Sequence, residues 1–344
     1  MSSDLAISAT GLSRTFRVPV REAGLRASLR SVVRRTYRDV HAVRGIDLAI
    51  APGEIVGFLG PNGAGKTTTL KMLSGLMHPT SGTARVLGVD PARRSRDFLT
   101  SISFVMGQRQ QLTSELPAAD SLEVLRATYR ISRPAFREQL DELTELLDLA
   151  PLLDKPVRQL SLGERMKCEL AAALIHRPTM LFLDEPTLGL DVQAQRRVRE
   201  FVASYAKRSG ATVLLTSHYM ADIEALCPRV VVIDHGELQF DGALRDLASR
   251  TSDRKFVRLT FAPGATTDDE TIRARIDPLG EVIDVDGAEW LIDVPRDELM
   301  ARMGPLLALP GVVDFTVEDE PIERVMERVF SRSTPVAATP VITA

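Results

Sequence analysis

The feature that most constrains the fold of this 344-residue chain is a glycine-rich turn between a predicted strand and a predicted helix. The turn is Gly60–Thr68, GPNGAGKTT, and it matches the pattern G-x-x-x-x-G-K-[ST]. The apolar segment EIVGFLG precedes it, and KTTTLKMLSGLM follows it. Such a strand, turn and helix direct backbone N–H groups inward, which suits phosphate oxygens. We therefore expect a phosphate-binding loop at the carboxyl end of a strand.

The residue types in this loop predict a nucleotide site with a metal ion. Lys66 can reach the β- and γ-phosphates, and the Thr67 hydroxyl can ligate Mg²⁺. The other loop residues supply the surrounding backbone cradle; they are Gly60, Pro61, Asn62, Gly63, Ala64, Gly65 and Thr68.

Two further apolar segments end in polar residues. LFLDEP carries Asp184 and Glu185, and ATVLLTSH ends in His218. Segments that are apolar on both faces are typical of parallel strands covered by helices. The carboxyl ends of such strands form the ligand-binding edge of an open α/β sheet. We predict that Asp184 holds Mg²⁺, that Glu185 polarises an attacking water, and that His218 is directed at the γ-phosphate.

A predicted helix start at Leu160–Glu164, LSLGE, has two interpretations. Ser161 can cap the first turn while Glu164 returns the hydrogen bond, as in a capping box. The same N-terminus can bind a phosphate group of another molecule through its N–H groups and dipole. The two interpretations are compatible, because one helix start can do both.

The pattern of segments predicts an α/β chain with two domains. Residues 1–245 alternate strands and helices, with a mostly helical subdomain at about 112–178. Residues 250–331 have the order β-α-β-β-α-β followed by a helix, which predicts a small α+β, ferredoxin-like domain. Residues 332–344 are predicted to be a disordered tail.

The charge is distributed unevenly along the chain. The formal net charge of -3 indicates neither a nucleic-acid binder nor an acidic tail protein. A basic insert at residues 17–38 contains seven Arg and one Glu, whereas residues 250–331 contain ten basic and eighteen acidic residues. The insert predicts a helix with an apolar and a basic face, which suits either an anionic membrane surface or packing on its own domain. The apolar face comprises Leu25, Leu29, Val32, Val33 and Thr36, and the basic face comprises Arg26, Arg30 and Arg34.

The hydrophobic pattern contains no candidate membrane span. The N-terminal segment MSSDLAISAT lacks an apolar core long enough for a secretory signal, and no run of about 18 apolar residues occurs. The two cysteines, Cys168 and Cys227, lie in apolar helical patterns that predict buried thiols. We therefore expect a cytoplasmic protein.

Together these segments resemble the ATP-binding cassette (ABC) ATPases over about residues 5–245. Six motifs occur in the order and at the spacings of that family: Gly60–Thr67, Gln108 in VMGQ, Leu160–Glu164, LFLDEP, Gly189–Asp191 and TSH at Thr216–His218. The resemblance implies a P-loop NTPase fold and an ATPase that uses ATP and Mg²⁺. It also implies a head-to-tail dimer, with a second copy or a homologous cassette, in which the phosphate loop of one copy faces Ser161, Gly163 and Glu164 of the other.

The resemblance assigns further roles. Gln108 would sense Mg²⁺ and water, Asp191 would lie in the loop after the catalytic strand, and an aromatic ring before Gly60 would stack on adenine. Tyr37 fits the spacing of that ring and is favoured over Phe16, which would fit if the basic insert were absent.

The helix start departs from the family pattern at two positions. The family usually has Gly where Leu162 stands and Gln where Glu164 stands. Leu162 is harmless if its side chain points away from the nucleotide. The negative charge of Glu164 is expected to weaken the contact with a triphosphate.

In this family, a chain with one nucleotide-binding domain and no membrane span pairs with a separate integral membrane permease. We therefore expect a transporter ATPase subunit, peripheral on the inner face of the cell membrane, with export favoured by general likeness and no nucleic-acid partner. The C-terminal domain is expected to be regulatory or to stabilise the dimer. Two alternatives are a cassette that acts on ribosomes or DNA and a nucleotide-gated module that hardly hydrolyses ATP.

Overall fold

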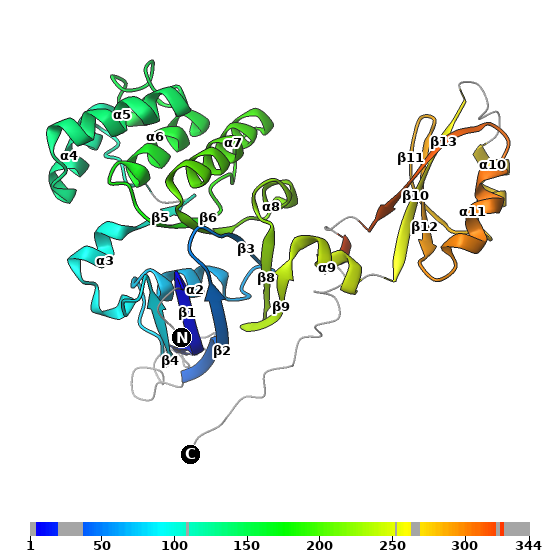
Figure 1. The fold of residues 1–344 in the computed structure, drawn as a ribbon, viewed down its shortest axis with the longest axis horizontal. Coiled ribbons are helices and arrows are strands. Elements are labelled where there is room, and N and C mark those ends of the chain that lie inside the picture. Colours follow the sequence, from blue (N-terminus) through cyan, green and yellow to red (C-terminus); the bar gives the residue numbers. More distant parts are fainter. Residues whose placement is uncertain are drawn as a thin grey trace, which may run out of the picture. The chain divides into compact units, whose positions relative to one another are not determined.

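The computed structural model describes residues 5–19, 37–107, 110–251, 253–262, 269–320 and 324–326. The chain forms two compact units that divide between Gly242 and Ala243. Figure 1 shows the elements of each unit. Most of the predicted basic insert, the whole predicted tail and Gln108 lie outside the described residues.

The first unit is built on a sheet of six strands in the order β5-β6-β7-β3-β8-β9. Neighbouring strands from β5 to β8 pair in parallel. Nearly every residue of β6, β7 and β8 is buried, as expected for a parallel sheet covered on both faces. The strands are β3 (Ile55–Leu59), β5 (Ile102–Met106), β6 (Met180–Asp184), β7 (Thr212–Thr216), β8 (Arg229–Asp234) and β9 (Glu237–Ala243).

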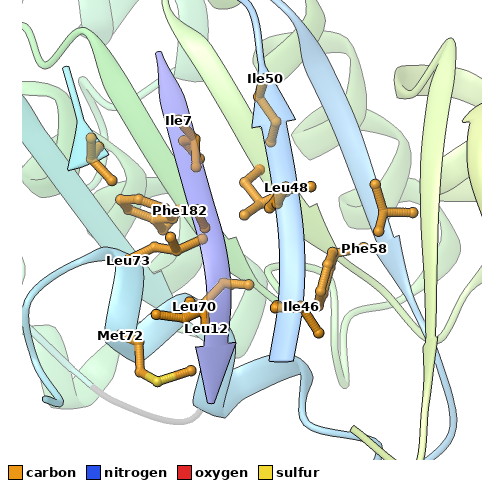
Figure 2. Packing of buried hydrophobic residues seen from close by; sticks show 14 of the residues in the cluster. Ile7, Leu12, Ile46, Leu48, Ile50, Phe58, Leu70, Met72, Leu73 and Phe182 are labelled. Carbon is orange, nitrogen blue, oxygen red and sulfur yellow. The ribbon is translucent and has the colours of Figure 1, made fainter. Parts of the chain in front are cut away.

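A second, antiparallel sheet has the order β2-β1-β4. Its strands are β1 (Ile7–Pro19), β2 (Tyr37–Ile50) and β4 (Ser81–Val86). Figure 2 shows its side chains packed against Phe58 and Phe182 of the parallel sheet and against α2 (Lys66–Leu73). This shared core fixes α2, and therefore the loop at its N-terminus, against both sheets.

The helices of the first unit lie mainly in the second half of its sequence. Helix α6 is buried over most of its length, including the unbroken run from Cys168 to Leu174, and it packs next to β5. The α-helices are α3 (Arg96–Ser101), α4 (Ala118–Tyr129), α5 (Arg133–Leu147), α6 (Leu162–Leu174), α7 (Val192–Ser209) and α8 (Met220–Leu226), and the short 3₁₀ turns are η1 (Pro91–Arg93) and η2 (Val157–Gln159). The predicted helical subdomain thus contains α4, α5 and α6.

The second unit has one antiparallel sheet in the order β11-β12-β10-β13. After α9 (Leu244–Thr251) its elements are β10 (Arg254–Phe261), α10 (Asp269–Ile276), β11 (Glu281–Asp286), β12 (Glu289–Pro295), α11 (Leu299–Leu307) and β13 (Val312–Asp319). The core centres on Trp290, which meets Phe261 edge-on at 5.9 Å between ring centroids. The predicted α/β fold with a ferredoxin-like C-terminal unit is confirmed.

Within the described part of the chain, no helix combines the length and the apolar character needed to cross a membrane.

Candidate functional site

The glycine-rich loop closes tightly on its neighbours. A Cβ atom at Gly60 would lie 2.2 Å from the carbonyl oxygen of Ile233, and one at Gly65 would lie 2.5 Å from that of Ala42. Gly65 also has φ of 111°, in the left-handed region that favours glycine. The loop is therefore held between β2 and β8, with α2 starting at Lys66.

The Lys66 side chain folds back across the loop. Its Nζ donates hydrogen bonds to the carbonyl oxygens of Gly60 and Pro61, at 2.5 and 3.1 Å. Burial lowers the pKa of Lys66, while the charges of Glu185 and Asp184 raise it. A charged phosphate oxygen is a stronger acceptor than either carbonyl, so the buried ammonium is placed to bind one.

The carboxylate of Asp184 joins the loop to two neighbouring strands. The Thr67 hydroxyl lies 3.0 Å from its Oδ2, and the Thr216 hydroxyl donates to its Oδ1 at 2.8 Å. Thr216, at the end of β7, is a contact that the sequence analysis did not assign, although it stands two residues before His218.

The Asp184 carboxylate and the Thr67 hydroxyl together suit a hard cation, which prefers oxygen ligands. No group of three or more His, Cys, Asp or Glu able to hold a metal occurs among the described residues. A cation at this edge would therefore take one protein carboxylate and one hydroxyl, from Asp184 and Thr67, and complete its shell with substrate oxygens. That ligand set is typical of Mg²⁺ in phosphate-transfer sites.

Glu185 and His218 meet at the same edge. His218 Nε2 lies 2.7 Å from Glu185 Oε1, and the two side chains are 36% and 22% exposed, so both remain accessible to a ligand. Glu185 has a left-handed φ of 56°, and its N–H donates to both oxygens of Thr216 at 3.1 Å. The backbone of Gly107 lies close to that of Glu185, because a Cβ atom at Gly107 would lie 2.4 Å from the Glu185 carbonyl oxygen.

The start of α6 forms a complete capping box. Ser161 Oγ accepts from the Glu164 N–H at 3.2 Å, and the Ser161 N–H donates to Glu164 Oε2 at 2.8 Å. The Lys155 ammonium lies 3.6 Å from the other carboxylate oxygen. The hydrogen bond from the Ser161 N–H, with smaller help from Lys155, lowers the pKa of Glu164. The lowered pKa keeps Glu164 ionised, so the repulsion expected between its charge and a triphosphate stays a prediction.

Leu162 and Gly163 contact the segment after β6. A Leu162 methyl lies 3.2 Å from where a Cβ at Gly189 would stand, and Ala194 lies equally close to Gly163. Asp191 caps α7 by accepting from the Ala194 N–H at 2.8 Å. The helix start and the Asp191 loop are therefore packed against each other within one copy.

The strand register reverses the preference between Tyr37 and Phe16. Ala42 is the residue of β2 that lies next to the phosphate loop, because its carbonyl oxygen is packed against Gly65. At about 3.3 Å per residue, Tyr37 lies roughly 17 Å along β2 from Ala42, whereas Val40 lies only about 7 Å away. Phe16 pairs with Val40, and Tyr37 pairs with Pro19 at the far end of the strands. Phe16 is therefore the better candidate for stacking on a base.

Each of these rings has an arginine on one face. Arg14 lies over the Phe16 ring at 4.8 Å, and Arg17 lies over the Tyr37 ring at 4.7 Å. Arg14 also donates to the His78 carbonyl oxygen, which anchors the stack on Phe16. One face of Phe16 is thus supported, and a base would use the other.

Comparisons with known proteins identify the family of the chain. Residues 43–188 match the family model described as "ABC transporter", and residues 253–318 match "EvrA-like ABC transporter, C-terminal domain". The chain is 34% identical over 220 residues to the ABC transporter ATP-binding protein NatA of Bacillus subtilis (strain 168), covering 63% of this chain and 89% of NatA. It is 35% identical over 255 residues to the Nod factor export ATP-binding protein I of Paraburkholderia xenovorans (strain LB400), covering 74% and 82%.

Among solved structures, the fold is similar to a dimeric post-hydrolysis state of the ATP-binding cassette MJ0796 bound to ADP and Pi. The TM-score is 0.56 at 24% identity, over 70% of this chain and 99% of that one. At this level of identity the likeness supports the fold alone.

Replacing Lys66 by Ala should weaken nucleotide binding by about tenfold or more, because a charge-assisted hydrogen bond typically contributes about 1.5–3 kcal/mol. Titration with a fluorescent ATP analogue measures the change. Lys71→Ala, in the last turn of the same helix, is the matched control for loss of one charge. Unchanged affinity in Lys66→Ala would contradict the assignment.

Phe16→Ala should weaken ATP binding by about 1–3 kcal/mol, the typical loss of a base stack on an aromatic ring. Tyr37→Ala should change it much less, and Phe16→Tyr should preserve it. The same titration separates the two rings. A larger loss in Tyr37→Ala would restore the preference based on spacing.

Ser161→Ala should destabilise α6 by about 1 kcal/mol through loss of the cap, and thermal unfolding measures this. Glu164→Gln should keep the cap, because glutamine also completes a capping box, and should tighten ATP-dependent dimerisation at low salt, because it removes a negative charge. Unchanged dimerisation at low salt would contradict this. Sedimentation with ATP tests the second point. Tightening that disappears at high salt would mean that the Glu164 charge does face the phosphate.

Proposed function

The chain belongs to the ATP-binding subunits of ABC transporters and is therefore an ATPase, and from this premise we propose how its residues carry out hydrolysis and what it drives. The observation that carries the proposal is the meeting of Lys66, Thr67, Asp184, Glu185 and His218 at one edge of the parallel sheet. Each of these side chains arises from a strand end or from the loop that follows β3.

ATP binds with its phosphates in the loop Gly60–Thr68. The backbone N–H groups and the start of α2 bind the phosphate oxygens, and Lys66 neutralises the β- and γ-phosphates. Thr67 and Asp184 would hold Mg²⁺, which when bound supplies positive charge to the β- and γ-phosphate oxygens. Phe16 would stack on the adenine.

Glu185 orients and polarises the water that attacks the γ-phosphate. Its carboxylate is partly exposed, so a water can reach it, and its contact with His218 limits its orientations. His218 can also donate a hydrogen bond to a γ-phosphate oxygen from its place beside β7. Such positioned groups act mainly through orientation and through charge stabilisation in the transition state.

A second copy completes the site by placing its α6 start on the γ-phosphate. Ser161, the backbone of Gly163 and the helix dipole are the contacting groups. Each helix-end interaction of this kind contributes about 0.3–1 kcal/mol when exposed and up to ~2 kcal/mol when partly buried. Closure of the dimer on ATP and its opening after hydrolysis would switch a membrane permease between two states.

The proposed partner is a separate integral membrane permease, and the proposed direction of transport is export. The relatives are named for Nod factor export and for daunorubicin resistance, which supports this direction. Because ATP is supplied inside the cell, the subunit would act on the inner face of the membrane. For the EvrA-like C-terminal unit we propose a regulatory or dimer-stabilising role.

Glu185→Gln should nearly abolish ATP turnover and leave ATP binding intact, because it keeps the shape and removes the charge that polarises water. It should also favour an ATP-bound dimer, since the repulsion between the carboxylate and the γ-phosphate is lost. Steady-state phosphate release and sedimentation with ATP measure the two effects. Turnover close to that of the unmodified protein would refute the proposed role.

A further inference from the structure

Asp222 is a buried carboxylate, and two of its hydrogen-bond partners, Thr187 and Ser217, lie close to Glu185 and His218 in the sequence. It lies in α8 with 1% of its surface exposed. Its Oδ1 accepts a hydrogen bond from Arg199 at 2.8 Å. Its Oδ2 accepts one from Ser217 at 2.7 Å and another from Thr187.

Two of these three donors belong to the segments that carry Glu185 and His218. Thr187 lies two residues after Glu185, and Ser217 directly precedes His218. Arg199 lies in α7, the helix that Asp191 caps. Ser217 also accepts from the Tyr219 N–H at 3.0 Å, which closes the turn around His218. The Asp222 carboxylate therefore connects the segment after Glu185 with the residue before His218. The side chains of Glu185 and His218 lie 2.7 Å apart.

We propose that Asp222 is a positioning residue for ATP hydrolysis, fixing the segments of Glu185 and His218 so that these two side chains meet. The inference rests on the roles proposed above for Glu185 and His218. An ionised carboxylate is the side chain best suited to this task, because it accepts hydrogen bonds on both oxygens and donates none. The Arg199 guanidinium compensates its charge, as a buried carboxylate requires.

Loss of the hydrogen bonds to Asp222 should lower ATP turnover and leave the affinity for ATP unchanged. The three partners of Asp222 lie outside the phosphate loop, and Lys66, Thr67 and Asp184 have their own contacts. Loss of the network would let Glu185 and His218 drift apart while the phosphates stay bound. Misplacement of a catalytic group by about 1 Å can cost on the order of 100-fold in rate.

The test compares Asp222→Asn and Thr187→Val with a control, Glu200→Gln. Asparagine replaces one acceptor oxygen by a donor, and valine removes a single hydrogen bond while keeping the shape. Glu200 forms an exposed ion pair with Arg196 on the same α7 helix, so its variant alters a charge away from the network. We expect kcat to fall roughly 10- to 100-fold in Asp222→Asn and less in Thr187→Val, with the Kd for ATP within about twofold. Glu200→Gln should match the unmodified protein.

A spectroscopic readout separates positioning from general destabilisation. The chain has five histidines, and ¹⁵N labelling of their rings with His218→Ala as the assignment standard identifies the His218 signal. We expect Asp222→Asn and Thr187→Val to shift this signal and leave the other four in place. If Asp222→Asn does not fold, Thr187→Val decides.

The inference is overturned if the folded variants keep kcat within twofold of the unmodified protein, or if the Kd for ATP rises by the same factor as kcat falls. Glu185→Gln and His218→Ala, measured alongside, test the underlying roles. If both retain full turnover, the proposed roles of Glu185 and His218 fail. If both lose turnover while Thr187→Val does not, only the positioning role of Asp222 fails.

Discussion

The carboxylate of Asp184 is the point on which the site depends. A buried carboxylate is stable only when its oxygens are hydrogen-bonded or paired with a cation. Asp184 meets this requirement with the Thr67 hydroxyl from α2 and the Thr216 hydroxyl from β7. These contacts align the ends of three neighbouring elements, so that Lys66 lies close enough to Asp184 and Glu185 for their charges to oppose the lowering of its pKa by burial. The core beneath, with Phe58, Phe182 and α2, keeps that alignment rigid.

The residues of the proposed phosphate site could be predicted from sequence because their positions follow from local structure. Lys66 and Thr67 stand at the start of a helix after a glycine turn, and Asp184, Glu185 and His218 follow buried strands. Parallel strands deliver their carboxyl ends to one edge, so no knowledge of strand order was needed to bring these residues together. The contacts between Thr216 and Asp184 and around Asp222 did need that order, because β6 and β7 become neighbours only in the folded sheet.

Two predictions made from sequence depended on contacts that only the fold defines. Spacing before Gly60 favoured Tyr37. The insert after Phe16 increases the number of residues between Phe16 and Gly60, but it leaves Phe16 at its place on β1. Register is what decides, and it places Phe16 opposite Val40. For Glu164, proximity to the helix start suggested repulsion of a phosphate. The carboxylate also contacts the Ser161 N–H and the Lys155 ammonium within its own chain. These partners lower its pKa and keep it charged, so the repulsion stays a prediction.

The two departures at the start of α6 have a common consequence. Leu162 packs toward Gly189, and Glu164 closes the capping box, so both side chains are used within one copy. In the proposed dimer, the groups that would face a partner's nucleotide are the Ser161 hydroxyl, the N–H groups of Leu162 and Gly163, and the helix dipole. None of these depends on the identity of residues 162 and 164. A helix start can therefore lose the usual glycine and glutamine and keep the same hydroxyl and backbone donors, while the charge of Glu164 is the change that a phosphate would meet.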